Sequence, residues 1–570
     1  MKNLRKITCL SLLLQFSLIA AFAQNLAGRQ DGIADSLAFI NHFKVKMPII
    51  KTPVFKKDTF DIKNFGAKAD GLFLNTKSIN DAITTCSSKG GGVVLIKGGL
   101  WLSGPIEMRS NVNLHLERDA ILLFTPDKSQ YKLVEGNWEG KKAVRNQSPI
   151  SGSNLENIAI TGTGIIDGNG GVWRMVKKEK LTESQWNKLI KTGGVLGGEN
   201  NKNWYPSAGF LKGELTKDAS VIQPGKALAD YADMKDFFRP NLLVLTNCKK
   251  ILLEGVIFQN SPAWCLHPIM CEDLTMKNVT VNNPWYAQNG DGVDIESCKN
   301  VMIENCTLDV GDDAICIKSG RDKDGRDRGI PTENVIARNN IVYHAHGGFV
   351  VGSEMSGGAK NLFVYNNSFI GTDIGLRFKT TRGRGGVVEK VYIANTYMKD
   401  IAAEAILFDM YYMAKDPVPL MGDKTEAPKI VVLPVTEETP QFRDFYIHNV
   451  VVSGAAKGIF IRGLPEMNIQ NINLENLNIQ SKIGVEISEA TNVNIKNLNF
   501  ITTSSNPLIA INNSKNVNFT NIKPIADYKS FFSISGEKTS GINLSGTPVS
   551  SVKEKTTYEF GANPKALTIK

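Results

Sequence analysis

The feature that most constrains the fold is a short strand-like pattern that recurs nine times along the chain. Each copy alternates apolar residues with others, sometimes loosely, and ends on an asparagine before a further apolar residue. The nine asparagines are Asn278, Asn305, Asn339, Asn366, Asn395, Asn449, Asn476, Asn497 and Asn521. They are spaced by 27, 34, 27, 29, 54, 27, 21 and 24 residues. Such near-regular repetition indicates a solenoid in which each repeat forms one coil.

The asparagines also indicate which solenoid this is. Asn tolerates the left-handed backbone of a tight bend, and its side chain can hydrogen-bond to the Asn of the next coil and build a ladder. The repeats therefore predict the coils of a parallel β-helix. A propeller or sandwich would instead need antiparallel hairpins with turn pairs such as Asn-Gly, which these repeats lack.

The first 23 residues have the composition of a signal peptide. Lys2, Arg5 and Lys6 precede a mostly apolar run over residues 7–19, and small residues before Gln24 suit a cleavage site. A retained membrane anchor is the weaker alternative because the run is short and polar residues interrupt it. We expect a secreted or periplasmic protein with no membrane span.

The remaining chain is expected to form one domain. Residues 24–55 read as a leader, and residues 56–560 as the β-helix, entered through a capping helix over about residues 76–88 with Ile79, Ala82 and Ile83 on its apolar side. Two stretches interrupt the repeat, at about 170–238 and at 416–439. Insertions into a solenoid form loops on one face and often border the binding groove, although packing or an oligomer contact would explain them equally well.

Charge and cysteine content narrow the partners. The net charge is +10 and falls to +7 once the three basic residues of the signal segment are removed. This suits a polyanionic partner, but scattered surface lysines explain it at least as well. Seven cysteines remain after the signal, an odd number placed in or beside repeat strands, so we expect buried thiols rather than a disulfide framework. No Cys/His cluster has zinc-ligand spacing, and no metal or other cofactor is expected.

Two acidic clusters stand just before strand patterns, about one repeat apart. They are Asn289-Gly-Asp291 and Gly311-Asp-Asp313. In the strands that follow, alternation turns Val293, Ile295, Ile315 and Ile317 inward and sends Asp294, Glu296 and Lys318 to the open face. His346 precedes a third strand, and a fourth turns Arg377 and Lys379 outward while burying Leu376 and Phe378.

Coils of a parallel β-helix stack about 4.8 Å apart, so these side chains are expected to meet. Three neighbouring carboxylates cannot all ionise freely, and their repulsion should raise at least one pKa. Hydrolysis of a glycosidic bond needs this division, with one carboxylic acid to protonate the leaving oxygen and one carboxylate to activate water. Each motif alone is weak, but four in order on one face are not expected by accident.

The order Asn-x-Asp, Gly-Asp-Asp, His-Gly, Arg-x-Lys resembles glycoside hydrolase family 28, the polygalacturonases and related pectin hydrolases. The resemblance implies a right-handed single-stranded parallel β-helix that hydrolyses with inversion and without a metal. It implies that Asp312 is the general acid, that Asp291 and Asp313 activate water, and that His346 tunes the acid. Arg377 and Lys379 would bind the galacturonate carboxylate.

The chain departs from the family pattern at two positions. Ala345 stands where the family commonly has Gly, and Gly290 where fungal members usually have Thr; neither change removes a reacting group. Asn289 is expected to contact substrate. Tyr412 matches a substrate-contacting Tyr, although Tyr411 or plain packing explains the match nearly as well.

The sequence thus predicts an inverting hydrolase of α-1,4-galacturonosyl linkages, with a weak preference for attack at chain ends. The expected partner is an acidic plant polysaccharide, pectin or oligogalacturonide, with no nucleic acid and a monomer as the default. Rhamnogalacturonan or xylogalacturonan hydrolysis is the nearest alternative. A pectate lyase, which would need calcium and a base for the C5 proton, and a non-catalytic carbohydrate-binding β-helix are alternatives from other classes.

Overall fold

The computed structural model describes residues 34–414, 430–503, 506–525, 528–547 and 555–570. The chain divides into two compact units, Met1–Pro48 and Ile49–Lys570. In the first unit the described residues form a helix over 34–43, and the predicted signal peptide lies outside the described residues. Every described helix falls short of the length and apolarity needed to cross a lipid bilayer.

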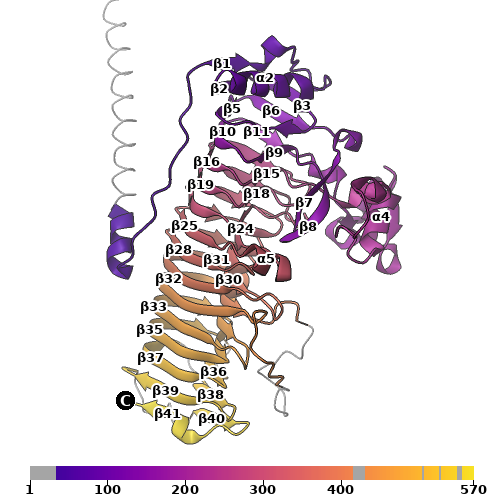
Figure 1. Cartoon of the computed structure of the whole chain (residues 1–570). Helices are drawn as coiled ribbons and strands as arrows, with labels where there is room; N and C mark the ends of the chain where they lie inside the picture. The colour runs from indigo at the N-terminus through magenta and orange to yellow at the C-terminus, as the bar shows by residue number, and fades with distance from the viewer. Residues whose placement is uncertain (1–33, 415–429, 504–505, 526–527, 548–554) are drawn as a thin grey trace, which may run out of the picture. The chain divides into compact units, whose positions relative to one another are not determined.

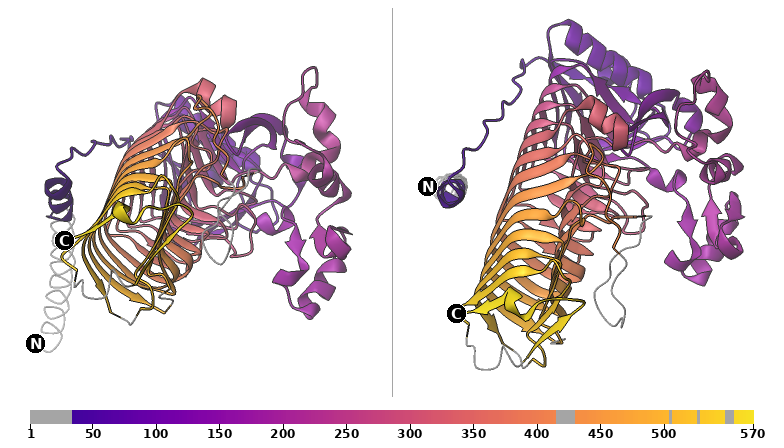
Figure 2. Two further views of the ribbon diagram at one scale, coloured as in Figure 1. Left: turned by 90° about the horizontal axis from the view of Figure 1, so that it is seen from below. Right: turned by 60° about the horizontal axis from the view of Figure 1, so that its bottom comes forward.

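The second unit is a right-handed parallel β-helix, as predicted. Each coil contributes one strand to each of three sheets, and each strand pairs in parallel with its counterpart in the next coil. For example, β22 (Lys299–Glu304), β23 (Thr307–Asp309) and β24 (Asp313–Lys318) pair with β25 (Thr332–Arg338), β26 (Ile341–Val342) and β27 (Gly347–Val351). The two further views show the strands stacked along the whole unit (Figure 2).

The sheet that carries the acidic motifs is called the site sheet below. Its strands are β4 (Ile106–Glu107), β9 (Ile150–Ser153), β15 (Leu243–Thr246), β18 (Leu266–Ile269), β21 (Val293–Glu296), β24, β27, β30 (Ile374–Lys379), the last parts of β31 (Val387–Asp409) and β32 (Gln441–Arg462), β34 (Ile483–Ser488), β36 (Ile509–Asn512), β38 (Phe532–Ser535) and β40 (Thr556–Glu559).

The other two sheets complete each coil. The sheet of the asparagine repeats holds β1 (Thr59–Asp61), β2 (Gly92–Ile96), β5 (Val112–Leu116), β10 (Glu156–Gly162), β16 (Lys249–Glu254), β19 (Glu272–Lys277), β22, β25, β28 (Ala359–Tyr365), β31, β32, β33 (Ile469–Ser481), β35 (Ala490–Thr502), β37 (Lys515–Pro524), β39 (Ser540–Ser545) and β41 (Leu567–Ile569). The third holds β3 (Gly99–Ser103), β6 (Ala120–Phe124), β11 (Ile165–Asp167), β17 (Ile257–Gln259), β20 (Thr280–Asn282), β23, β26 and β29 (Ser368–Ile370), and is continued by the long strands from β31 onward.

The asparagine ladder has the predicted form. All nine repeat asparagines have φ between 50° and 57°, in the left-handed region. The Nδ2 of Asn395 donates to Oδ1 of Asn366 at 3.1 Å, and the series continues through Asn449, Asn476, Asn497 and Asn521 at 2.8–3.3 Å. Each bend therefore satisfies its own polar groups from the neighbouring coil, so the apolar stripes can face the interior.

The core is a continuous column along the inside of the coils. The six residues predicted to point inward from the four motif strands are at most 1% exposed: Val293, Ile295, Ile315, Ile317, Leu376 and Phe378. Phe378 stacks on Phe408 of the next coil with ring centroids 4.6 Å apart. Burial of each such side chain stabilises the fold by about 1.5–3 kcal/mol.

A helix closes the N-terminal end of this column. The helix α2 spans Thr76–Ser88, as predicted, and its Ile79, Ala82 and Ile83 are fully buried in the core. It lies across the first coils at the end of the stack (Figure 1). The seven described cysteines are free and buried.

The sequence did not reveal an antiparallel hairpin, β7 (Leu133–Trp138) with β8 (Lys141–Asn146). The predicted insertion after it folds as α3 (Glu183–Ile190), α4 (Ala208–Leu215), a ten-residue 3-10 helix η6 (Leu228–Phe237) and a small sheet of β12 (Val176–Lys177), β14 (Asn203–Tyr205) and β13 (Val195–Gly197). Hairpin and insertion share a core of Val144, Ala219, Tyr231, Met234 and Phe238. Together they project from one side of the β-helix (Figure 2).

Short helices complete the described chain. They are η1 (Ile62–Phe65), η2 (Lys128–Gln130), η3 (Gly170–Val172), η4 (Lys178–Lys180), η5 (Glu199–Asn201), α5 (Asp322–Arg328) and η7 (Pro564–Ala566). Of the second predicted interruption, residues 415–429 lie outside the described residues.

Candidate active site

The three acids of the two motifs meet at the edge of the site sheet. Val293 pairs with Ile315 across β21 and β24, and the amide of Gly292 donates to the carbonyl of Asp313 at 2.9 Å, so the same register sets Asp291 opposite Asp313. One carboxylate oxygen each of Asp291, Asp312 and Asp313 lies within 4.8 Å of the others. The juxtaposition predicted from coil stacking is therefore present.

The glycines of these motifs allow the close approach. A Cβ on Gly311 would lie 2.6 Å from the carbonyl oxygen of Pro284 and 2.7 Å from that of Ala287, and a Cβ on Gly292 would lie 2.5 Å from the carbonyl oxygen of Ala314. Real Cβ atoms do not approach backbone oxygens so closely, so any side chain here would push the coils apart. Gly is needed at both bends for the acids to stay together.

Asp313 is bound by two cations. Its Oδ1 accepts from Nη1 of Arg377 at 3.0 Å, and its Oδ2 accepts from Nζ of Lys379 at 2.7 Å. Burial raises the pKa of Asp313, but the charges of Lys379 and Arg377 more than offset this and hold the pKa below its ordinary value. Asp313 is the ionised member of the trio.

Asp291 has the opposite environment. It is 3% exposed, and its Oδ1 accepts no hydrogen bond from any described residue. Burial, followed by the nearby charges of Asp294 and Asp312, raises the pKa of Asp291 well above its ordinary value. The predicted raised pKa is present, but desolvation contributes more to it than mutual repulsion does.

Asp312 is the most accessible of the three acids and is bonded to an imidazole. Its Oδ1 lies 3.1 Å from Nδ1 of His346, and Nε2 of His346 lies 3.8 Å from a carboxylate oxygen of Asp373. The hydrogen bond to Asp312 raises the pKa of His346 above its ordinary value. A solvent-accessible carboxyl coupled to an imidazole can exchange a proton with a bound molecule.

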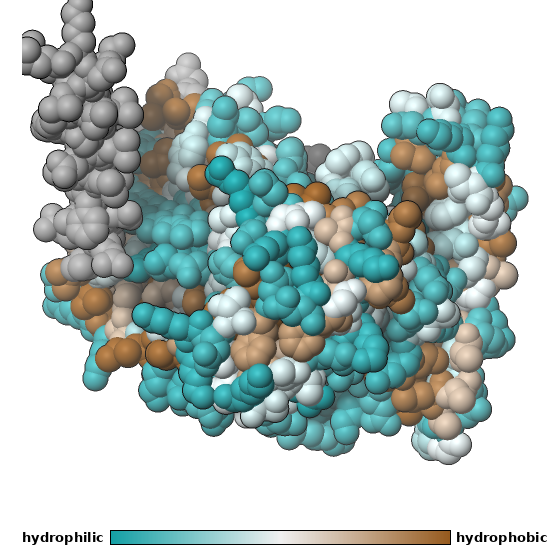
Figure 3. Space-filling model, turned by 90° about the horizontal axis from the view of Figure 1, so that it is seen from above, coloured by the Kyte–Doolittle hydropathy of each residue, from teal (hydrophilic) through white to brown (hydrophobic). Residues whose placement is uncertain are grey.

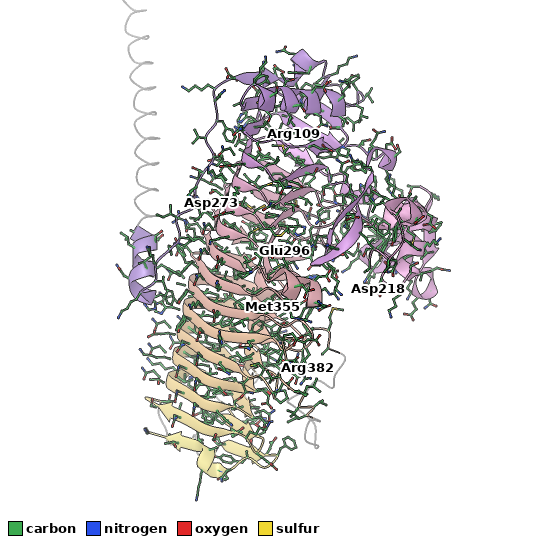
Figure 4. All side chains as sticks on the ribbon, viewed as in Figure 1. Arg109, Asp218, Asp273, Glu296, Met355 and Arg382 are labelled. Carbon is green, nitrogen blue, oxygen red and sulfur yellow. The ribbon has the colours of Figure 1, made fainter. Side chains whose placement is uncertain are left out.

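One prediction about this face is wrong. Asp294, Glu296 and Lys318 point away from the core, as alternation requires, but they are at most 4% exposed rather than open to solvent. The hairpin reaches over them, since Nδ2 of Asn137 donates to Glu296 at 3.2 Å. Glu296 also binds His267 at 2.8 Å and Arg328 at 2.6 Å. Figure 4 places Glu296 beside the hairpin, midway along the stack.

Lys318 belongs to the same covered layer. Its Nζ lies 2.9 Å from Glu354 and 3.6 Å from Asp294. Burial raises the pKa of Glu354, but Lys318 and Lys379 more than offset this and lower it to about 2. A buried ionic layer thus lies under the acids and fixes the charge around them.

The two remaining predicted residues border the acids. The ring of Tyr412 lies under both cations, with Nζ of Lys379 4.8 Å and the guanidinium of Arg377 5.7 Å from its centroid. Tyr411 is instead buried in the core. Asn289 accepts a 2.8 Å hydrogen bond from Nη2 of Arg239, a residue that the sequence did not single out.

Hollows lie next to the acids. One of about 700 Å³ is lined by His346, Gly311, Asp373, Trp285 and Lys180, of which Lys180 comes from the insertion. A second, of about 260 Å³, is lined by Asn289, Trp138, Arg145 and Arg239 together with insertion residues. In the face seen in Figure 3, hydrophilic side chains cover most of the surface and hydrophobic ones are interspersed among them. The hairpin and the insertion therefore supply walls of the site.

The acid trio is close enough to share one metal ion. Its charge is already balanced in part, because Arg377 and Lys379 bind Asp313 directly. Divalent cations bind oxygen-rich sites whose negative charge is not compensated. The positive charges of Arg377 and Lys379 reduce the net negative charge of this site. The arrangement favours proton transfer over metal binding.

The fold and this site are similar to those of parallel β-helix glycoside hydrolases. Residues 225–448, which include the acid trio, His346 and both cations, match the model of Glycosyl hydrolases family 28. The matched part of the chain resembles that family.

Individual relatives support the assignment. A Vitis vinifera protein named probable polygalacturonase is 30% identical over 346 residues, 59% of this chain and 60% of that relative, so the match spans less than two thirds of its length. A Dickeya chrysanthemi exo-poly-alpha-D-galacturonosidase is 27% identical over 460 residues, 77% of this chain and 70% of the relative. The crystal structure of a Thermotoga maritima exopolygalacturonase is similar with a TM-score of 0.59 and 26% identity, covering 83% of this chain and 93% of that one.

Proposed function

We propose that this protein hydrolyses α-1,4-galacturonosyl linkages in polygalacturonate or pectin, releasing units from chain ends. The observation that carries the proposal is the trio of carboxylates within 4.8 Å of one another, one held ionised by two cations and one bonded to an imidazole. The names of the relatives from Vitis, Dickeya and Thermotoga support the substrate class.

The three acids divide the work according to their surroundings. Asp312, accessible and bonded to His346, protonates the glycosidic oxygen as the bond to C1 breaks. A water molecule attacks C1, and Asp313 accepts its proton because the two cations keep this carboxylate ionised. Asp291 orients that water through Oδ1, which has no other partner among the described residues. His346 then returns a proton to Asp312 and is reprotonated from solvent, while Asp313 releases its proton to solvent.

The stereochemical outcome is a test of this division. Inverting enzymes usually hold their two carboxyls roughly 6.5–9.5 Å apart and retaining ones about 5–5.5 Å, whereas the oxygens here come within 4.8 Å. The charges favour inversion despite this spacing, because a carboxylate bound by both Arg377 and Lys379 is a weak nucleophile but can still accept a proton. Attack by water inverts C1, and proton NMR of the first product reads the anomer directly.

A uronate carboxylate fits beside the two cations. Nε of Arg377 is buried and unbonded within the described part of the chain, so the guanidinium has a donor to spare beyond Asp313. The ring of Tyr412 holds both cations in place from below. Guanidinium and carboxylate match in shape and charge, which favours galacturonate over a neutral sugar next to the cut.

Attack at chain ends follows from the walls around the acids. The hairpin covers the coils on the N-terminal side of the trio, and the insertion contributes residues to both hollows. We infer that these walls restrict how far a polymer chain can extend across this side. We further propose secretion, supported by the composition of residues 1–23.

The decisive experiment incubates purified protein with a long oligogalacturonide and separates the early products by chromatography. Release of monomers or dimers with new reducing ends supports chain-end hydrolysis, and a ladder of mixed oligomers means internal cleavage. An unsaturated product absorbing in the ultraviolet would mean a lyase. The Asp312→Asn variant should lose turnover while it still binds the polymer, whereas a binding module would be indifferent to it.

A further inference from the structure

Two arginines beside the acid trio line a hollow and form no ion pair with any described residue. Arg145 from β8 and Arg239, just after η6, are 7% and 9% exposed. Both lie over the ring of Trp138, with guanidinium carbons 3.9 Å and 6.0 Å from its centroid. They line the 260 Å³ hollow that also contains Asn289.

Neither arginine has a carboxylate partner among the described residues. Nη2 of Arg145 is buried and makes no hydrogen bond there. Arg239 donates only to neutral acceptors: the carbonyls of Pro262 and Gln288, and Oδ1 of Asn289. Three acids act on Arg239 from nearby without forming an ion pair with it. Glu139 pairs with Arg321 at 2.6 Å, Glu214 lines the same hollow and is exposed, and Asp291 belongs to the acid trio.

The electrostatics of the pair are unfavourable without a ligand. Burial, and then the like charge of Arg239, lowers the pKa of Arg145 well below its ordinary value. Burial and the charge of Arg174 lower the pKa of Arg239 to about 10. Two buried cations without an anion are costly to the fold, and such unpaired charges gather at binding sites.

Packing explains one arginine in part but does not explain both. The bonds of Arg239 position the loop at Gln288 and Asn289, two residues before Asp291. Arg145 stacks on Trp138, which itself stacks on Trp264 at 5.6 Å. The cation–π contact with Trp138 accounts for part of the charge of Arg145. It does not account for Nη2, which is buried and makes no hydrogen bond with the described residues.

We propose that Arg145 and Arg239 form a second carboxylate-binding site, which takes the uronate group of a galacturonate unit other than the one held by Arg377 and Lys379. This inference rests on the proposed function and deepens it. The indole of Trp138 offers an apolar face to the sugar ring, and the two guanidiniums offer donors to its carboxylate. The site makes recognition of two acidic units a condition for productive binding.

The test compares free-acid and ester ligands. The variants are Arg145→Gln and Arg239→Gln, made in the Asp312→Asn background so that ligand is not consumed, with Arg118→Gln as the matched control. Arg118 is exposed, lies in the bend between β5 and β6, and is not among the residues that line the hollow. Calorimetry measures the Kd of trigalacturonate and of its fully methyl-esterified form.

Each Gln variant should weaken binding of the free acid about 10- to 100-fold, as expected for the loss of a hydrogen bond between charged groups. Binding of the ester should stay nearly unchanged, and the control should match the parent for both ligands. Free-acid affinity that is unchanged in both Gln variants, or lost equally for acid and ester, would overturn the proposal.

Two further results keep the inference separate from the proposed function. If a Gln variant fails to fold, the variants Arg145→Lys and Arg239→Lys are tested in its place, because each keeps the charge but loses the planar pair of donors. The preference for the free acid over the ester should then fall without vanishing. An unchanged preference in both Lys variants would refute the site. Wild-type protein that does not cleave oligogalacturonide, yet binds it in preference to the ester through these arginines, would refute the hydrolase alone.

Discussion

Replacement of Asp291 by Asn should inactivate the protein and stabilise it at the same time. Asp291 is buried, its Oδ1 has no hydrogen-bond donor among the described residues, and the charges of three carboxylates, Asp294, Asp312 and Asp313, act on it. The ionised carboxylate of Asp291 is therefore less well stabilised in the folded protein than in water, where the unfolded chain exposes it. Asn has nearly the same shape and removes the charge.

The magnitude follows from the buried charge and the size of the folded unit. Asn keeps a polar group at this position, so the gain comes from removal of the charge, and each unit of raised pKa corresponds to about 1.4 kcal/mol. Unfolding entropy is about 2 cal/mol/K per residue, so for a cooperative unit from Ile49 to Lys570 each 1 kcal/mol shifts Tm by roughly 1 °C. We expect Asp291→Asn to raise Tm by about 1–3 °C at neutral pH and to lower kcat about 10²- to 10⁴-fold.

The change in stability caused by Asp291→Asn depends on pH. Because the folded pKa of Asp291 is raised above 3.8, its contribution to the free energy of unfolding is most favourable below pH 3.8 and declines as pH rises toward the folded pKa. The gain in Asp291→Asn should therefore grow with pH and vanish in acid. Differential scanning calorimetry at several pH values measures it.

The control is Asp309→Asn, at the end of β23. Its carboxylate is 43% exposed and pairs with His344, so neither Tm nor its pH dependence should change appreciably. Destabilisation of Asp291→Asn at every pH, or retention of near wild-type turnover, would refute the reasoning about burial and charge.

Three other predictions concern the same charges. Release of reducing sugar from polygalacturonate should persist in EDTA, since Arg377 and Lys379 already neutralise Asp313; activity abolished by EDTA and restored by calcium would contradict this. Because its bond to Asp312 raises the pKa of His346 above 6.5, the alkaline limb of kcat/KM should lie above pH 6.5 and be lost in His346→Gln; an unchanged profile would remove His346 from the mechanism. Glu354 has a pKa of about 2 against an ordinary 4.5, so the stability it contributes is complete above pH 4.5 and is lost as pH falls toward 2. Glu354→Gln should therefore lower Tm at pH 7 and reduce the fall of Tm in acid. An equal fall of Tm in both proteins would argue against the pairing of Glu354 with Lys318.

The sequence by itself determined the coil and its register. Apolar alternation and the recurrent Asn are local properties, and each coil contacts mainly its neighbours, so a repeated local pattern is sufficient to predict parallel stacking. The same reasoning brought Asp291, Asp312, Asp313 and His346 together, because residues one coil apart in a parallel sheet must be adjacent.

The alternation of inward and outward side chains did not predict the direction of residues at the strand ends. Asp313 has the parity of Ile315 and Ile317, which lie in the core, yet its carboxylate binds the outward cations Arg377 and Lys379. Asp313 is the first residue of β24, directly after the bend at Gly311, so the regular pleat has not yet begun there. Asp291 likewise precedes its strand.

Only the tertiary structure decided what covers the site. The hairpin that reaches over Glu296 comes from residues 133–146, more than a hundred residues earlier, and it is held by the core that it shares with the insertion. Non-local packing of this kind leaves no periodic trace in the sequence. For the same reason Trp138, Arg145 and Arg239 look like ordinary surface residues until the fold brings them beside the acids.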